Sequence, residues 1–317
     1  MNEFELIAQY FSPLGALLPG AASDDLGIGD DAALLQPVQG RQLVVCTDTL
    51  VAGRHFDEQL TAASIGYKAL AVNLSDLAAM GAQPRAFTLA LTLPEFDADW
   101  LAGFAEGLQA IAEQFSCRLI GGDTTRGPLS ITITAIGDVA NGRALLRSGA
   151  RVGDQIAVSG YLGDAALALR LDVQAPELLR KRLHRPCPRI GLGQLLGGRA
   201  HSCIDLSDGL VGDLGHILKA SGVGARIRPD LLPASPAFLA HCDPVDRLAL
   251  QGAGGDDYEL CFTAPAAVMA RLASAAEEPI TVIGEITESP GLTLIDTDGA
   301  SMAAQISDQI SAYQHFE

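Results

Sequence analysis

Lysine is scarce in this 317-residue chain, which carries it only at Lys68, Lys181 and Lys219. Lysine and arginine together number 21, against 38 aspartates and glutamates, so the formal net charge is −17 at pH 7. Binding to nucleic acid or to an anionic membrane surface depends on clustered lysine and arginine side chains. We therefore expect neither nucleic acid nor a membrane as a partner.

Long apolar runs and paired cysteines are also missing. No run of about 18 or more apolar residues occurs, so the sequence predicts no membrane-spanning helix. The first residues, MNEFELIAQYF, carry acids where a secretory signal peptide carries positive charge. The six cysteines are scattered without a CxxC pair, which indicates reduced thiols and argues against a zinc site. Together these absences predict a cytoplasmic protein.

The common phosphate-binding signatures do not occur either. The chain has no GxxxxGK[ST] loop and no HRD-type catalytic loop paired with a strand lysine. A bound phosphate would therefore have to be held by metal ions, by the amides of glycine-rich turns or by arginine. The candidates are the weak Gly121-Gly122 signal and Arg147, for which the alternative is a surface side chain in a linker.

Apolar periodicity indicates an α/β fold in the first half of the chain. Alternating patterns predict strands at 42–47, 86–93 and 130–139. Helical spacing predicts helices at 61–80, with Thr61 as the N-cap, and at 98–115. Strands that alternate with helices are typical of an α/β domain with helices packed on a sheet.

The second half repeats this alternation after a polar stretch without a clear period. We place an N-terminal domain at 1–140, a linker at 141–149 and a C-terminal α/β domain at 150–317. Two domains agree with a chain of this length. The expected elements are strands near 155–159, up to Asp205, and near 258–264, 280–284 and 291–296, helices from about 163 and at about 208–221, and a turn at Asp298-Gly299.

Acidic residues gather in five short motifs that also contain glycine or a hydroxyl residue. The motifs are Gly29-Asp30-Asp31, Thr47-Asp48-Thr49, Gly121-Gly122-Asp123-Thr124-Thr125, Asp205-Leu206-Ser207-Asp208-Gly209 and Gly254-Gly255-Asp256-Asp257-Tyr258-Glu259. A turn or a helix cap explains any one of them taken alone. Five acidic loops that converge in so acidic a protein would repel one another without bridging cations. Carboxylate and hydroxyl oxygens suit Mg²⁺, so we predict several Mg²⁺ ions bound together with a polyphosphate.

One further acid, Asp76, lies inside the apolar helical stretch KALAVNLSDLAAM. A carboxylate in such a stretch must be paired, bound to metal or exposed. Helical spacing places Asn73 on the same face. Asp76 is therefore a candidate ligand.

Seven segments, in order along nearly the whole chain, carry a resemblance to the thiamine-monophosphate kinase family. They are LGIGDDAAL (26–34), TDTLVAGRHF (47–56), YKALAVNLSDLAAMGAQP (67–84), LIGGDTTRGP (119–128), RSGARVGD (147–154), IDLSDGL (204–210) and GGDDYELCF (254–262). This family is similar to aminoimidazole ribonucleotide synthetase and selenophosphate synthetase. The resemblance implies a two-domain fold with mixed sheets, in which the N-terminal domains pair in a homodimer. It also implies transfer of the γ-phosphate of ATP to thiamine monophosphate, which gives thiamine diphosphate.

The resemblance assigns roles to the matching residues. It implies Mg²⁺ ligands at Asp30, Thr47, Asp48, Asp76, Asp123, Asp205 and Asp208, with a backbone contribution from Cys46, where a hydroxyl residue is also common in the family. It implies ATP contacts at Gly122, Asp123, Arg147 and Ser207. It implies substrate contacts at His55, Glu259 and Tyr313. Each of these three residues has an alternative interpretation: His55 as a structural histidine, Glu259 as a solvated carboxylate at a strand edge, and Tyr313 as a tail aromatic packed on the surface.

A phosphate acceptor is already deprotonated at neutral pH, so we expect no general base in such a transfer. The barrier is repulsion between anions and their alignment, which bound Mg²⁺ relieves. Two other functions stay open. One is an ATP-dependent synthetase of the same superfamily, although residues 1–25 lack the cysteine expected of a selenide-activating enzyme. The other is an inactive acidic scaffold that binds cations.

Overall fold

The computed structural model describes residues 3–15, 25–57 and 60–302, so the predicted substrate contact Tyr313 lies outside the described residues. The chain divides into two compact units. The first unit comprises Met1–Leu77 and Ala82–Asn141, and the second comprises Ala78–Gly81 and Gly142–Glu317.

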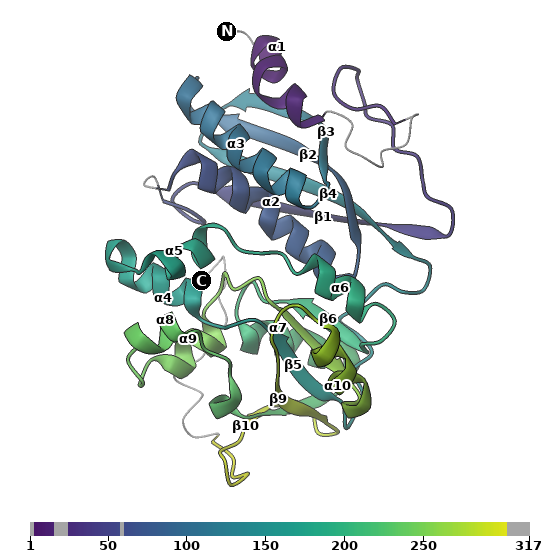
Figure 1. Ribbon diagram of the computed structural model, residues 1–317, viewed down its shortest axis with the longest axis vertical. Helices are drawn as coiled ribbons and strands as arrows, with labels where there is room; N and C mark the ends of the chain where they lie inside the picture. The colour runs from purple at the N-terminus through teal and green to yellow at the C-terminus, as the bar shows by residue number, and fades with distance from the viewer. Residues whose placement is uncertain (1–2, 16–24, 58–59, 303–317) are drawn as a thin grey trace. The chain divides into compact units, whose positions relative to one another are not determined.

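The first unit is built on a four-stranded sheet with the strand order β1-β4-β2-β3. Its strands are β1 (Arg41–Val51), β2 (Gln83–Leu93), β3 (Arg118–Arg126) and β4 (Ser130–Ala140). β2 and β3 pair in parallel, whereas β4 pairs antiparallel with both β1 and β2. The helices α2 (Ala62–Ala79) and α3 (Ala98–Gln114) lie on the same side of this sheet in Figure 1. The N-terminal helical turns are α1 (Glu3–Leu6), η1 (Ile7–Phe11) and η2 (Ser12–Gly15).

Sequence features explain why these helices form and why they pack so closely. The hydroxyl of Thr61 accepts the N–H of Ser64 at 3.2 Å, which confirms the predicted N-cap of α2. Glycines let α2 and α3 touch, since a Cβ atom at Gly107 would lie 1.8 Å from the carbonyl oxygen of Ala63. A Cβ atom at Gly66 would lie 2.1 Å from the carbonyl oxygen of Phe104. Only glycine permits this backbone contact.

The predicted strands and helices of the first half are present, but the sequence analysis missed β3. The sequence predicts an acidic loop at 121–125, whereas these residues continue a strand that pairs with β2. The segment shows no alternation of apolar residues, because it consists of glycine, aspartate and threonine. Likewise β1 runs past the expected end at 47, so Asp48 and Thr49 are strand residues.

The second unit is built on a six-stranded sheet with the order β10-β7-β9-β5-β8-β6, in which only β10 and β7 pair in parallel. Its strands are β5 (Gln155–Ser159), β6 (Ser202–Asp205), β7 (Gly224–Ile227), β8 (Leu260–Ala264), β9 (Ile280–Thr287) and β10 (Gly291–Leu294). Its helices are α4 (Asp164–Leu171), η3 (Asp172–Gln174), α5 (Glu177–His184), α6 (Ile190–Leu196), α7 (Leu210–Ser221), η4 (Pro229–Leu231), α8 (Pro236–His241), α9 (Arg247–Ala253) and α10 (Ala266–Ala275). Sheets of mixed direction with helices confirm the predicted α/β class with mixed sheets.

The main core of the second unit joins the sheet to α7. Leu210, Leu214 and Ile217 of α7 are buried together with Ile156 of β5 and Ile204 of β6. The expected strand at 155–159 and the strand end at Asp205 are confirmed. No disulfide joins the six cysteines, all of which lie in described segments. Among the described residues, no helix combines the length and the apolar character that crossing a membrane requires.

Candidate functional site

Asp48 lies where β1 packs against α2. The backbone N–H of Asp48 donates to the side-chain oxygen of Asn73 at 3.1 Å, and the thiol of Cys46 donates to the Asn73 carbonyl oxygen at 3.3 Å. Asn73 is fully buried, and its amide group donates to the carbonyl oxygen of Ala69. Asn73 therefore fixes the backbone of β1 at the predicted metal ligands.

Asp76 is the one residue from Lys68 to Ala79 that is not buried. It lies one helical turn after Asn73, so the two side chains share a face of α2. An acid that keeps solvent access in an otherwise buried stretch can still contact a ligand from solvent. The structure thus brings Asp48, Asn73 and Asp76 to one junction of β1 and α2.

Thr47 behaves differently from its neighbours. Side chains alternate along a strand, so Thr47 faces the side of the sheet opposite Cys46 and Asp48. Its hydroxyl pairs with the hydroxyl of Thr134 on β4 at 2.9 Å. A ligand from Thr47 on the Asp48 side would have to be its backbone carbonyl rather than its hydroxyl.

Asp30 occupies an exposed hairpin-like loop. The backbones of Leu26 and Leu34 exchange two hydrogen bonds of 2.9 Å, which close the loop. The Asp30 carboxylate accepts the N–H of Asp31 at 2.9 Å. Both acids are exposed at the tip, where their carboxylates can reach a cation.

His55 lies in the turn that follows β1. Its Nδ1 accepts the backbone N–H of Val51 at 3.0 Å, so the neutral ring carries its proton on Nε2. Nε2–H is the atom that such a ring offers to an anion. The turn brings the histidine next to the end of the strand that carries Asp48.

Gly122 and Asp123 lie within β3. A Cβ atom at Gly122 would lie 1.8 Å from the carbonyl oxygen of Leu89 on β2, so only glycine fits at this position. Asp123 pairs with Ala90 and is exposed. Gly122 therefore seats β3 tightly on β2 just before the predicted ligand.

In the second unit, Asp205 ends β6 and the loop 206–209 leads into α7. One carboxylate oxygen of Asp213 accepts the backbone N–H groups of Ser207, Asp208 and Gly209, each at 3.1 Å. Burial, followed by the charge of nearby Asp205, raises the pKa of Asp213 to about 7. Sequence reasoning missed Asp213, although an acid on the apolar face of the predicted helix is the same signal that had identified Asp76.

The segment 254–259 supports this loop from the other side. The N–H of Asp256 donates to the Ser207 carbonyl at 2.9 Å, and the N–H of Tyr258 donates to the Leu206 carbonyl at 2.8 Å. Asp256 and Tyr258 adopt left-handed backbone angles, with φ of 65° and 49°. Strained residues of this kind persist where surrounding contacts hold them, often at functional sites.

Asp257 and Glu259, the acids of the same segment, are committed to internal contacts. Asp257 accepts the N–H of Gly163 at 2.9 Å, and burial raises the pKa of Asp257 well above its usual value. Arg189 binds Glu259 through two hydrogen bonds, of 2.7 and 2.5 Å, and the Ser159 hydroxyl donates to the same carboxylate at 2.5 Å. Glu259 is only 3% exposed. Its substrate contact stays a prediction, and its observed contacts are structural.

Arg147 lies on an exposed loop that is tied to the end of α7. The hydroxyl of Ser221 donates to the Arg147 carbonyl at 3.3 Å and accepts the N–H groups of Gly149 and Ala150 at 3.1 and 3.2 Å. Ser221 is a second residue that sequence reasoning missed. No local pattern signals it, because its partners lie more than 70 positions away along the chain.

The predicted metal ligands are divided between the units. Asp30, Asp48, Asp76 and Asp123 belong to the first unit, and Asp205 and Asp208 to the second. Within residues 3–15, 25–57 and 60–302, no three His, Cys, Asp or Glu side chains lie close enough to hold one metal ion. The single Mg²⁺ cluster therefore stays a prediction. The donor oxygens nonetheless fit Mg²⁺, and the mutual repulsion felt by Asp213 beside Asp205 is what a cation would relieve.

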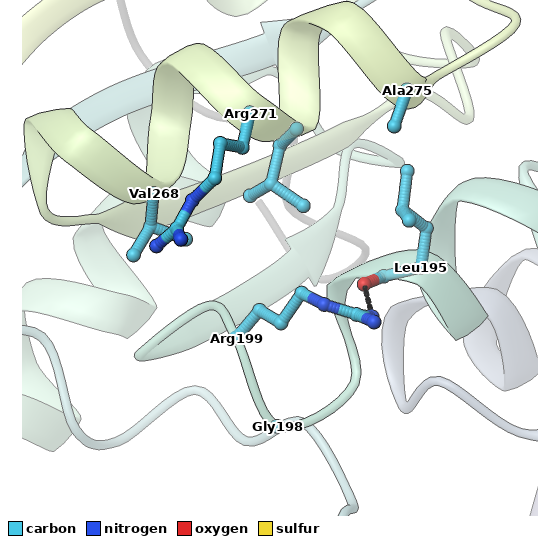
Figure 2. Close-up of a pocket in the computed structure, with 7 residues that line it drawn as sticks. Leu195, Gly198, Arg199, Val268, Arg271 and Ala275 are labelled. Atoms are coloured by element: carbon cyan, nitrogen blue, oxygen red, sulfur yellow. Dashed lines mark hydrogen bonds between the residues drawn. The ribbon is translucent and has the colours of Figure 1, made fainter.

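Within the second unit, a hollow of about 460 Å³ is separate from the Asp205 loop. Figure 2 shows it between α6 and α10, where Arg199 donates to the carbonyl oxygen of Leu195 at 2.6 Å. Its lining residues are Leu195, Gly198, Arg199, Val268, Arg271, Leu272 and Ala275. These lining residues lie before the first residue of β6 or after the last residue of β8. Because β6 and β8 are antiparallel, both places are at one end of the strand pair, and Asp205 and its partner Leu260 are at the other end.

Comparison with known proteins identifies the family of the chain. Residues 29–139 match the model of the AIR synthase related protein N-terminal domain, and residues 144–297 match the C-terminal domain. The thiamine-monophosphate kinase of Escherichia coli K12 is 49% identical over 297 residues, which cover 90% of each chain. The chain belongs to the thiamine-monophosphate kinase family. Family membership confirms the resemblance found in the sequence and the two-domain AIR synthase-like fold.

Solved structures of the thiamine-monophosphate kinase family agree. The crystal structure of the enzyme from Stenotrophomonas maltophilia K279a has a TM-score of 0.82 and 49% identity, and the match covers 88% of this chain and 92% of that one. A structure described as AaThiL complexed with AMPPCP and TMP has a TM-score of 0.78 and 30% identity, and the match covers 91% of this chain and 92% of the other. The family fold thus extends over both units.

Proposed function

We propose that this protein transfers the γ-phosphate of ATP to thiamine monophosphate and releases thiamine diphosphate and ADP. The observation that carries the proposal is the 49% identity to a thiamine-monophosphate kinase over 90% of both chains. A 30% identical relative described as bound to AMPPCP and TMP supports the pair of substrates.

Two kinds of side chain have different roles in this proposal: carboxylates bind metal, and hydrogen-bond donors bind the substrates. The carboxylates of Asp30, Asp48, Asp76, Asp123 and those of Asp205 and Asp208 are the oxygens that would hold Mg²⁺. Bound Mg²⁺ supplies the positive charge that lets two anionic phosphates approach. His55 donates from Nε2 to the acceptor phosphate, and Arg147 and the Ser207 hydroxyl bind the nucleotide.

The reaction requires no proton acceptor on the protein. The attacking phosphate oxygen is already anionic, its bond to the γ-phosphorus forms as the β–γ bridging bond breaks, and ADP leaves with the electron pair. What the chain must do is align these oxygens in line and exclude water. An aspartate in such a site holds metal rather than accepting a proton.

Purified protein with ATP, thiamine monophosphate and Mg²⁺ is expected to form thiamine diphosphate and ADP in equal amounts. We expect the rate to rise with Mg²⁺ with a Hill slope above one, because several ions act together. Chromatography of the products and a Mg²⁺ titration measure both quantities. Absence of thiamine diphosphate would overturn the proposed function, and saturation as for one ion would count against several ions.

We also propose that the first units of two chains pair as a homodimer through the sheet face opposite α2 and α3. On β1 this face carries Leu43 and Val45, which are 58% and 60% exposed. Beyond them the Thr47–Thr134 and Thr49–Thr132 hydroxyl pairs leave few unpaired polar groups to desolvate. Exposed apolar side chains on an otherwise satisfied sheet face are typical of a protein interface.

Sedimentation velocity is expected to give about 66 kDa for the protein, twice the 33.0 kDa chain mass. The Val45→Glu variant is expected to sediment as a 33.0 kDa monomer, because a charge would be buried at the interface. Leu239→Glu is the matched control, since Leu239 is 56% exposed on α8 of the second unit. A monomeric parent protein, or dimeric Val45→Glu, would contradict this interface.

A further inference from the structure

The loop between β6 and α7 directs three successive backbone N–H groups to one point. Ser207, Asp208 and Gly209 all donate to the same carboxylate oxygen of Asp213. The Asp213 side chain lies in the first turn of α7 and is 3% exposed. Such an array of consecutive amides is the arrangement that glycine-rich loops use to cradle a phosphate.

In this protein the cradle is already filled by a side chain of the chain itself. Because all three amides are engaged by Asp213, they are not available to a nucleotide phosphate. Only side chains of the loop can make that contact. Ser207 and Asp208, the hydroxyl and the carboxylate of the loop, both keep solvent access.

The opposite side of the loop is held as firmly. The carbonyl oxygens of Leu206 and Ser207 accept the N–H groups of Tyr258 and Asp256. Gly209 has a φ of 110°, and a Cβ atom there would lie 2.8 Å from the backbone of Ala253. The loop is therefore held by α7 on one side and by the 254–259 segment on the other.

We propose that Asp213 is a positioning residue for nucleotide and metal binding, which fills the amide cradle and thereby turns the Ser207 hydroxyl and the Asp208 carboxylate outward. The proposal rests on the proposed function, since it assumes that this loop meets a metal-bound nucleotide. Asp213 itself touches neither. It acts through the backbone of 207–209.

The test is binding of the ATP analogue AMPPCP with Mg²⁺, measured by calorimetry on the full chain without acceptor. Asp213→Asn keeps the size of the side chain but replaces the carboxyl group, which can carry a negative charge, by a neutral amide, and this weakens the three hydrogen bonds that the side chain accepts. We expect the dissociation constant of AMPPCP and the half-saturating Mg²⁺ concentration each to rise about tenfold. Raising Mg²⁺ tenfold is expected to restore binding, because the ligands themselves are intact.

Asp154→Asn is the matched control. Asp154 is also 3% exposed in the second unit, and its carboxylate accepts the N–H of Arg151 at 2.9 Å and contacts His201 Nδ1 at 2.8 Å. The Asp154→Asn variant is expected to have a lower melting temperature and an unchanged half-saturating Mg²⁺ concentration. If Asp213→Asn behaves in the same way, or if extra Mg²⁺ does not restore binding, Asp213 is not a positioning residue.

A second measurement does not depend on the folding of Asp213→Asn. Ser207→Ala and Asp208→Asn are each expected to weaken AMPPCP binding, because the loop contacts the nucleotide through these side chains. Unchanged binding in both variants would overturn the proposal. These measurements use no acceptor, so a parent protein that binds AMPPCP but does not phosphorylate thiamine monophosphate would refute the proposed function and leave the test of Asp213 intact.

Discussion

The Asp48→Asn variant is expected to turn over at least about 100-fold more slowly than the parent protein. Asparagine has the shape of aspartate but lacks the charge that a metal ligand supplies, and the loss of several kcal/mol of charge stabilisation corresponds to this factor. The fold should be retained, because the contact of this residue with Asn73 is made by its backbone N–H. Formation of thiamine diphosphate measures the rate, and urea denaturation measures the free energy of unfolding.

Asp99→Asn is the control for loss of one negative charge. Asp99 is an exposed acid in the first turn of α3, in the same unit as Asp48. Its replacement is expected to leave turnover within twofold of the parent value, since an exposed charge of this kind contributes little. Turnover of Asp48→Asn above a few per cent of the parent would show that Asp48 is not an essential ligand.

The Arg189→Met variant is expected to lose about 3–5 kcal/mol of unfolding free energy, because it leaves the Glu259 charge buried without its partner. Arg189 and Glu259 are 8% and 3% exposed, and two hydrogen bonds join them. Urea denaturation measures the loss. A double variant, Arg189→Met with Glu259→Gln, is expected to recover part of the lost free energy, because neither position of the pair then carries a buried charge.

The exposed pair of Arg226 and Glu285 provides the contrast. The two side chains are 53% and 51% exposed, although Arg226 Nη2 and Glu285 Oε1 lie only 2.5 Å apart. Arg226→Met is expected to change the unfolding free energy by about 0.5 kcal/mol or less, because water screens such a pair. Equal losses for Arg189→Met and Arg226→Met would mean that burial does not determine the strength of the Glu259 contact.

The sequence predicted the elements whose pattern is local and long. The helices at 61–80 and 98–115 and the strand at 130–139 have many apolar residues in a regular period, and they form within a few residues of the expected limits. The strand β3 was missed because glycine, aspartate and threonine give no apolar alternation. The short helices α5, α6, α8 and α9 span at most eight residues, too few for a period to stand out.

For the candidate site, sequence patterns gave the carboxylates but not the residues that hold them. Asp48 was identified in a short acidic motif that also contains threonine, and Asp76 as an acid in an apolar helical stretch. The partner of Glu259 was not foreseen, because Arg189 lies 70 positions away and no local period connects them. The sequence also did not reveal that, in the 254–259 segment, Asp257 and Glu259 form internal hydrogen bonds. Such pairings follow from tertiary contacts.

The two ends of α7 hold the two loops from which nucleotide contacts are proposed. Asp213 in its first turn fixes 207–209, and Ser221 at its last residue fixes the loop of Arg147. A helix of 12 residues measures roughly 18 Å, and it does not stretch. α7 is therefore a rigid spacer, and a nucleotide that contacts both loops has to match the separation that the helix sets. Lengthening α7 by one residue would turn one loop about 100° away from the other and would break that match.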